Sequence, residues 1–304
     1  MIKEINLSLE ILKRGELKAQ LNNRKKRLKY LLRGILTFPY TYKLNNFIVN
    51  HNYLKKRVYD YPILISKIHR PYLYLNSDIS MKVKGIINTY KLIDENLSLG
   101  LQEELYKKGY INIGEIEGKD GRKYIVRFNV YTSFDKEGEV SITIFSPDKV
   151  KLGTITFSIL NIKNKNIIFI GGMQGAKRDI DKEVIKENSK NLYGIFPKKL
   201  LVESLYFLDK SLGFNFDKYA VGNGSHVYKA RRYNRKRVIL ANYDGFWESL
   251  ESKKEGEIWK LPDAIHRKKI EDVPSKKRNQ VRKKYFLLQE LEKSINKINR
   301  LWYT

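Results

Sequence analysis

The chain contains no cysteine, and only four of its 304 residues are histidine. The absence of cysteine excludes disulfide bonds, thiolate nucleophiles and cysteine-ligated metal centres. No two histidines stand at the close spacing with which one helix binds a metal ion. The sequence therefore predicts a protein without a bound metal.

Long apolar runs are also missing. No window approaches the roughly eighteen apolar residues of a membrane-spanning helix, and charged residues interrupt the apolar ones in residues 1–20. We therefore expect no transmembrane segment and no secretory signal, and a location in the bacterial cytoplasm. Apolar residues in the first segment, such as Ile2, Ile5 and Leu9, recur at near-helical spacing. That pattern predicts an amphipathic helix, which either packs on its own domain or lies peripherally on the inner face of the membrane.

Acidic residues are scarce, with 33 Asp and Glu against 60 Lys and Arg. The imbalance lies at the flanks: residues 1–60 carry 14 basic and 4 acidic residues, and residues 226–284 carry 18 and 8. The centre, residues 109–225, carries 18 and 14. Drift in an AT-rich genome raises lysine without any functional demand, but it does not explain a local arginine cluster. We expect a polyanion partner, which is nucleic acid, an anionic lipid surface or the phosphates of a cofactor.

The densest basic segment, residues 229–237, holds six cations with Tyr228 and Tyr233 among them. Cations interleaved with aromatic residues contact phosphates and stack on bases in single-strand binders, although a solvated cationic face has the same composition. The residues predicted to bind a polyanion are Lys229, Arg231, Arg232, Arg235 and Arg237.

The apolar pattern divides the chain into three regions, residues 1–108, 109–252 and 253–304. The first shows helical periodicity, and the last contains a long basic helix from about residue 276 to 298. The central region alternates as antiparallel strands do, then shows two helices and a further strand. Its strands are expected at residues 111–117, 123–131, 139–146, 151–160, 166–170 and 216–221, and its helices at 179–192 and 197–212. The predicted fold is α+β, with a helical amino-terminal region and a basic carboxyl-terminal helix packed on a mostly antiparallel sheet.

Four segments carry a resemblance to a known family. They are residues 170–177 (IGGMQGAK), 197–205 (PKKLLVESL), 221–250, which contain GNGSHVYKARRYNRKR, and 261–278. In these segments the chain resembles the VirK/YbjX family of bacterial proteins, and the resemblance covers about residues 69–295. It implies a role in virulence, envelope stress response, resistance to antimicrobial peptides and DNA damage response. The family supplies no agreed catalytic residues.

The order of elements in residues 111–228 also resembles the core of the GNAT acyltransferases, in which splayed strands make room for acyl-coenzyme A. A glycine-containing loop in that superfamily cradles the pyrophosphate. Residues 171–177, GGMQGAK, offer glycines and a glutamine in a different order, and they lack the second glycine and the hydroxyl of a Walker A motif. The acyltransferase hypothesis requires a coenzyme-sized cleft beside this loop; otherwise the glycines only let a strand turn. The candidate cofactor-binding residues are Gly171, Gly172, Gln174, Gly175 and Lys177.

Glu203 and His226 are the candidate catalytic residues. Glu203 lies at the edge of an apolar helix face, where burial would raise its pKa, or it is a solvated residue paired with Lys199. His226 serves as a general base or phosphate donor, or it is a buried structural histidine. The adjacent Ser225 does not fit a nucleophile elbow, so we expect it to cap a helix beginning near Val227.

Overall fold

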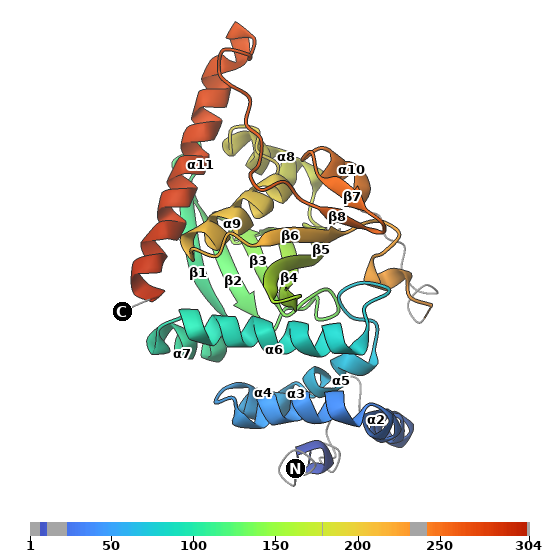
Figure 1. Cartoon of the computed structure of the whole chain (residues 1–304). Coiled ribbons are helices and arrows are strands. Elements are labelled where there is room, and N and C mark those ends of the chain that lie inside the picture. The colour runs from blue at the N-terminus through green and yellow to red at the C-terminus, as the bar shows by residue number, and fades with distance from the viewer. Residues whose placement is uncertain (1–6, 11–22, 178, 232–241, 303–304) are drawn as a thin grey trace.

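The computed structural model describes residues 7–10, 23–177, 179–231 and 242–302, with side chains to residue 297 (Figure 1). One eight-stranded mixed sheet lies at its centre, with helices on both sides. This confirms the predicted α+β fold. The strands are β1 (Tyr110–Glu117), β2 (Lys123–Val130), β3 (Val140–Phe145), β4 (Lys151–Ile162), β5 (Lys165–Gly175), β6 (Asp217–Val221), β7 (Lys253–Glu255) and β8 (Ile258–Lys260).

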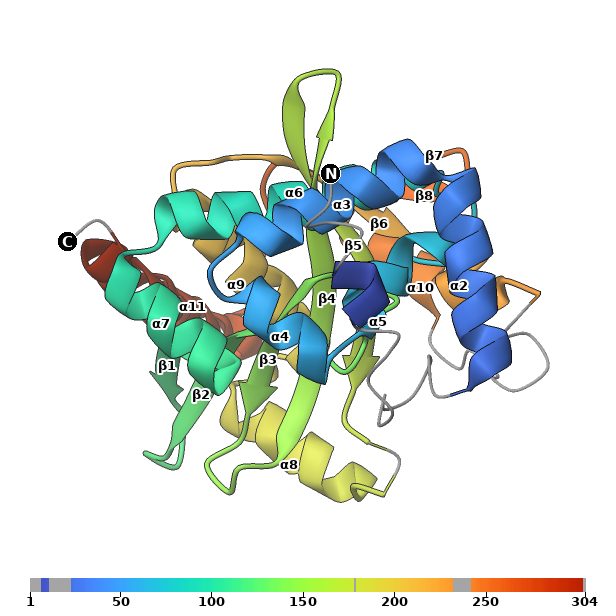
Figure 2. The ribbon, with the colours of Figure 1, turned by 90° about the horizontal axis from the view of Figure 1, so that it is seen from below.

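The amino-terminal region is helical, as predicted. Seen from below, α3, α4 and α5 lie in front of the central strands, and α2 lies beside them (Figure 2). The longest helix of this region, α6, begins where the Asp78 side chain accepts a hydrogen bond from the Met81 amide. Its elements are α2 (Arg24–Leu36), α3 (Phe38–Asn50), α4 (Leu54–Asp60), α5 (Ile63–Ser66), η1 (Lys67–His69), α6 (Ile79–Asn96) and α7 (Leu99–Lys108).

The sheet has the order β1-β2-β3-β4-β5-β6-β8-β7. Strands β1 to β5 form the predicted antiparallel meander, whereas β6 pairs with β5 in parallel. Two helices lie between β5 and β6 in the chain, α8 (Lys182–Asn191) and α9 (Pro197–Ser211). The latter opens with Pro197 in its first turn and is followed by Gly213 at a φ of 69°, both as its sequence predicts.

After β6 the chain forms η2 (Val227–Lys229), α10 (Tyr243–Glu248), the β7–β8 hairpin and α11 (Ser275–Trp302). The hairpin extends the sheet beyond β6, and α11 packs against β1 and α9. One hydrophobic core joins all three sequence regions and includes Leu44, Ile142 and Leu291. None of the helices in the described part of the chain has the length and apolar character needed to cross a bilayer.

The prediction of a loop after residue 170 was wrong. Residues 171–175 do not form a loop, because β5 continues through Gly175 and pairs with β4 as far as Gly153. The pairing shifts between Thr156 opposite Gly172 and Phe157 opposite Ile170, which leaves Gly171 without a partner at a β-bulge.

Candidate functional site

At the bulge, β5 lies directly against Glu137, which stands in the turn three residues before β3. A Cβ atom at Gly171 would overlap the carbonyl oxygen of Glu137, and one at Gly172 would overlap the Glu137 carboxylate. A Cβ atom at Gly138 would overlap the backbone of Phe157. The glycines therefore permit a close approach of chains, which neither the phosphate-loop nor the strand-turn interpretation anticipated.

Glu137 is fully buried beside residues from three other segments. Gln174 Nε2 donates to Glu137 Oε1 at 3.0 Å, and His226 Nε2 lies 3.6 Å from the same oxygen. The Tyr243 hydroxyl lies 3.4 Å from His226 Nε2 and also bonds to the amide and carbonyl groups of Met173. The structure thus unites two predicted site residues, Gln174 and His226, with Glu137 and Tyr243, which the sequence interpretation had not selected as site residues.

His226 is held as a neutral ring. Its Nδ1 accepts a hydrogen bond from the Tyr228 amide at 3.3 Å, so in the neutral ring Nε2 carries the proton toward Glu137 and Tyr243. Burial lowers the pKa of His226 to about 4. His226, and not Ser225, therefore caps η2, because the Ser225 hydroxyl instead accepts from the Gly222 amide.

A neutral imidazole beside a carboxylate is a pair suited to moving a proton. Here, however, Glu137, His226 and Tyr243 each expose no more than 2% of their surface. A substrate would reach them only after neighbouring elements move. In the observed state the cluster ties the turn before β3 to β5, η2 and α10.

A second buried glutamate, Glu139, anchors the helical region to the sheet. Its Oε1 accepts from Lys67 Nζ at 2.7 Å and from the Tyr72 hydroxyl at 2.5 Å. The Ser158 hydroxyl bonds to both Tyr72 and the Glu139 amide. A cation and a hydroxyl thus offset the cost of burying this carboxylate.

Glu203 lies on α9, and its described contacts do not join it to His226. Its Oε2 accepts from Arg267 Nη2 at 3.1 Å, so its partner is Arg267 and not Lys199. Glu203 is buried and borders a surface cleft of about 530 Å³. Both acidic and basic side chains line that cleft, among them the buried pair Asp209 and Lys218, 2.6 Å apart. The two candidate catalytic residues therefore do not form one site.

The predicted polyanion-binding residues are only partly described. Lys229 and Arg231 are exposed at and just after η2, whereas Arg232, Arg235 and Arg237 lie outside the described residues. Lys177 is exposed beyond the end of β5, where its charge acts on Lys151.

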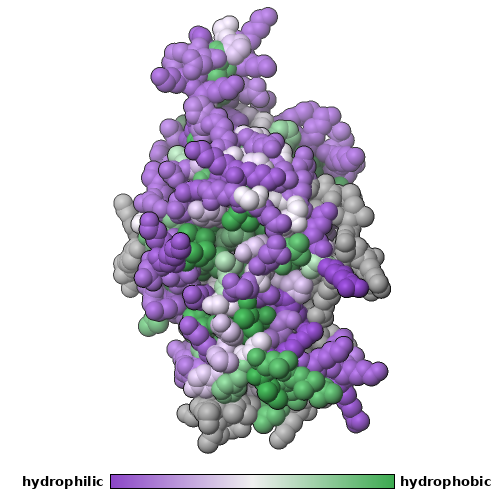
Figure 3. All heavy atoms as spheres, turned by 45° about the vertical axis from the view of Figure 1, so that its right-hand side comes forward, coloured by the Kyte–Doolittle hydropathy of each residue, from purple (hydrophilic) through white to green (hydrophobic). Residues whose placement is uncertain are grey.

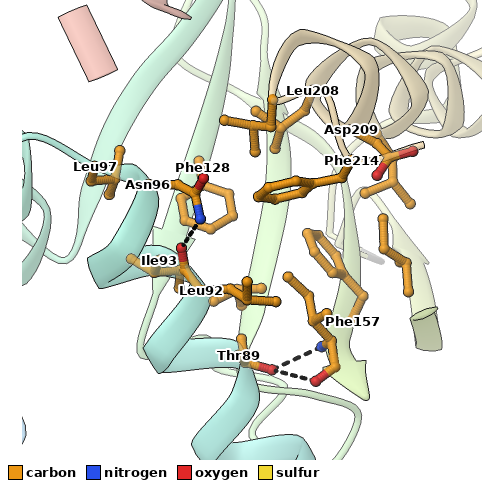
Figure 4. Close-up of a pocket in the computed structure, with 15 residues that line it drawn as sticks. Thr89, Leu92, Ile93, Asn96, Leu97, Phe128, Phe157, Leu208, Asp209 and Phe214 are labelled. Atoms are coloured by element: carbon orange, nitrogen blue, oxygen red, sulfur yellow. Dashed lines mark hydrogen bonds between the residues drawn. The ribbon is translucent and has the colours of Figure 1, made fainter. Parts of the chain in front are cut away.

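A narrow apolar cavity lies between α6, α9 and the sheet (Figure 4). Its volume of about 40 Å³ has room for only a few water molecules. The polar groups that Figure 4 shows at its edge are satisfied within the protein, since Asn96 donates to the Leu92 carbonyl and Thr89 bonds to Ile159. This cavity is too small for a substrate.

The largest feature that the sequence interpretation missed is a surface on α2. Leu28, Leu32, Ile35 and Leu36, which we call the apolar face of α2, expose between 52% and 83% of their surface. Figure 3 shows a hydrophobic patch in the lowest part of the molecule, where α2 and α3 lie in Figure 1. The i, i+4, i+7, i+8 spacing was visible in the sequence, but it does not tell whether the helix face meets the core or solvent.

The comparisons with known proteins agree on one family. A family model described as "Protein of unknown function (DUF535)" matches residues 19–297. "Uncharacterized protein YbjX" of Escherichia coli (strain K12) is 30% identical over 268 residues, which are 88% of this chain and 81% of the relative. An "Uncharacterized protein" of Haemophilus influenzae is 25% identical over 277 residues, 89% of this chain and 88% of the relative. No solved structure matches the chain significantly. The chain therefore belongs to the DUF535 family, as the motifs resembling VirK and YbjX proteins indicated.

Proposed function

We propose that the protein works at an anionic membrane surface, to which the apolar face of α2 and the surrounding basic residues attach it. The observation that carries this proposal is the exposure of four large apolar side chains on one side of a cationic helix. On the opposite side, Tyr30 is buried and bonds to Ser8, and Arg33 donates to the His69 carbonyl. One side of the helix therefore packs on the protein, and the apolar face of α2 on the other side is exposed.

The charge of α2 selects an anionic surface. Its sequence, RKKRLKYLLRGIL, contains six basic residues and no acidic one. Each basic residue near an anionic membrane contributes about 1 kcal/mol, and burying each leucine adds on the order of 1–2 kcal/mol. Nucleic acid would attract the same cations but would leave the leucines in water. A membrane therefore accounts for both features, whereas nucleic acid accounts for one.

This location agrees with what the family resemblance implies. Envelope stress and resistance to antimicrobial peptides are both events at the bacterial membrane, and a protein attached to its inner face is placed to take part in them. The virulence and DNA-damage associations add no constraint on the mechanism.

Vesicle co-sedimentation tests the proposal. The protein should pellet with phosphatidylglycerol vesicles and much less with phosphatidylcholine vesicles. The double variant Ile35→Gln/Leu36→Gln should weaken that binding at least tenfold, because it replaces the two most exposed apolar side chains of α2 with polar ones. Leu99→Gln is the matched control, since Leu99 is 78% exposed on α7.

Two outcomes would overturn it. The first is equal pelleting with neutral and anionic vesicles. The second is absence of vesicle binding together with salt-sensitive binding to DNA or RNA that the α2 variant leaves unchanged; this result would favour the nucleic-acid alternative.

A GNAT-like acyltransferase is the second candidate. The order of elements favours it, because an antiparallel meander is followed by helices and then by β6, which is parallel to β5. The parallel pairing ends at Ile170 and Ala220. Beyond that point Tyr243 bonds to Met173 of β5, and Trp247 Nε1 donates to the Val221 carbonyl of β6 at 2.9 Å. Side chains of α10 thus occupy the place where the hypothesis requires an open cleft. Acyl-coenzyme A binding would need α10 to move, and a rise in melting temperature with acyl-coenzyme A is the test.

A further inference from the structure

A polar hollow of about 330 Å³ lies between α4, the α7–β1 turn and strands β2 to β4. Its floor is a row of side chains from three adjacent strands. Asn129 Nδ2 donates to Thr143 Oγ1 at 3.1 Å, and Thr143 Oγ1 lies 3.1 Å from Thr154 Oγ1. Ser141 continues the row. Ser141, Thr143 and Thr154 expose between 2% and 4% of their surface, so they form the bottom of the hollow. They line it with hydroxyl groups, whereas a core face of a sheet would line it with apolar groups.

The rim of the hollow is cationic. Arg57, Lys107, Lys108 and Lys151 line it, and none of the described residues that line it is acidic. Lys108 has a partner in Glu104 on the same helix, at 2.8 Å. The remaining three cations share a concave surface without a carboxylate, an arrangement that attracts anions.

The carboxylates just outside the hollow are already bonded. Asp94 lies 2.9 Å from His51 Nε2 and accepts from the Tyr106 hydroxyl. Asp135 lies 3.6 Å from Lys136 Nζ. Neither lines the hollow, so the excess of positive charge remains there.

The side chain of Arg57 is placed to bind an anion in the hollow. Its guanidinium carbon lies 4.4 Å from the centroid of the Tyr131 ring, and its buried Nε has no hydrogen-bond acceptor within the described part of the chain. Tyr131 itself has a φ of 59°, a left-handed conformation that is strained for a tyrosine. A planar guanidinium with free donors matches the oxygens of a phosphate or carboxylate.

Lys151 faces a like charge. Burial and the charge of Lys177 both lower the pKa of Lys151. An anion bound in the hollow would relieve that repulsion. Lys177 itself, which the sequence suggested as a phosphate-binding residue, does not line the hollow.

We propose that this hollow binds a small hydroxylated anion, of which a sugar phosphate is the model: Arg57 and Lys151 hold the anionic group, and Asn129, Thr143 and Thr154 bond to the hydroxyls. The volume lies at the lower end of the range for small-molecule sites. The inference is independent of membrane attachment, because none of the hollow's lining residues belongs to α2.

Isothermal titration calorimetry with glucose 6-phosphate, glucose and inorganic phosphate tests the proposal. Glucose 6-phosphate should bind at least tenfold more tightly than phosphate, and glucose should give no heat at the same concentration. Lys151→Gln should weaken glucose 6-phosphate binding at least tenfold. Thr154→Val should weaken glucose 6-phosphate but leave phosphate unchanged. The melting temperature of each variant shows that it is folded.

Lys254→Gln is the matched control. Lys151 Nζ and Lys254 Nζ each lie 5.7 Å from the centroid of an aromatic ring, that of Phe134 and of Trp259 respectively, but Lys254 lies outside the hollow. Absence of heat with glucose 6-phosphate and phosphate at 10 mM overturns the proposal, as does binding that Lys151→Gln and Lys254→Gln change equally. To separate a lipid headgroup from a soluble ligand, Lys151→Gln is also tested on phosphatidylglycerol vesicles. Unchanged pelleting supports a soluble ligand, and a tenfold loss overturns it in favour of the headgroup.

Discussion

At Gly171 an added methyl group would overlap the carbonyl oxygen of Glu137. This oxygen belongs to the backbone, so no change of side-chain rotamer can relieve the overlap. We predict that Gly171→Ala lowers the free energy of unfolding by about 3 kcal/mol, the upper part of the range for overpacking a close approach. Urea denaturation measures it. Gly175→Ala is the control in the same strand, because a Cβ atom there has no neighbour within 4 Å. Equal effects of the two changes would show that the close approach is unimportant.

His226 makes stability depend on pH. Burial lowers its pKa to about 4, whereas the unfolded chain has an ordinary histidine, so below pH 6.5 the unfolded state binds more protons. Stability is therefore complete above about pH 6.5 and falls as the pH drops toward 4, by as much as about 3 kcal/mol. His69, whose pKa burial and nearby cations also lower to about 4, adds a loss in the same direction.

The variant His226→Asn isolates this contribution, since an asparagine can still cap η2 but does not titrate. Urea unfolding at pH 7.5 and pH 5.0 should show a smaller pH dependence in His226→Asn than in the natural chain. His266→Gln, at an exposed position, should leave the dependence unchanged. If His226→Asn left the pH dependence of the free energy of unfolding unaltered, His226 would not be the group responsible.

At this scale the sequence identified single residues but not their partners. His226 and Gln174 stand out beside glycines, whereas Glu137 and Tyr243 come from distant segments that only the folded sheet brings to them. Glu203 was recognised as a helix-edge residue, but its partner Arg267 lies in an irregular segment with no periodic signal. Long-range polar pairing has no local pattern from which it could be predicted.

At the scale of elements, the buried pair Lys67 and Glu139 joins η1 to the start of β3, since Glu139 directly precedes that strand. We predict that Lys67→Met lowers the free energy of unfolding by about 3–5 kcal/mol, because it leaves the Glu139 carboxylate buried without its cation. Thermal or urea denaturation measures the loss. The double variant Lys67→Met/Glu139→Gln should recover part of it.

Lys108→Met is the matched control for that pair. It breaks an ion pair with Glu104 in which both side chains are largely exposed and screened by solvent, so we expect a much smaller loss of stability than in Lys67→Met. If Lys67→Met lowered the free energy of unfolding no more than Lys108→Met does, the Lys67–Glu139 pair would not anchor the helical region.

Most elements were predictable because their signals are local, such as the proline at the start of α9 and the alternation in β1 to β4. The end of β5 was not predictable, because glycine is common both in turns and in β-bulges. The bulge at Gly171 follows from the close approach of Glu137, which has no signal in the local sequence. For α2 the period was correct, but which face meets solvent depends on the rest of the fold.

On the scale of the whole molecule, the antiparallel order of β1 to β5 follows from their short turns, whereas the parallel placement of β6 was only suggested by the helices before it. The insertion of β8 between β6 and β7 had no sequence signal, because both strands are three residues long. Net basic charge was evident from composition, but its pairing with exposed leucines on α2 required the structure.

If the basic residues and exposed apolar side chains of α2 hold the molecule on an anionic membrane, α2 enters the lipid, and the absence of cysteine allows a single label to report this. A single Leu36→Cys variant labelled with the environment-sensitive fluorophore NBD reports whether α2 enters lipid, and Leu99→Cys is the equally exposed control. With phosphatidylglycerol vesicles, NBD at residue 36 should brighten and shift to the blue, while NBD at residue 99 should not. An unchanged spectrum at residue 36, or the same change at both positions, would contradict the claim.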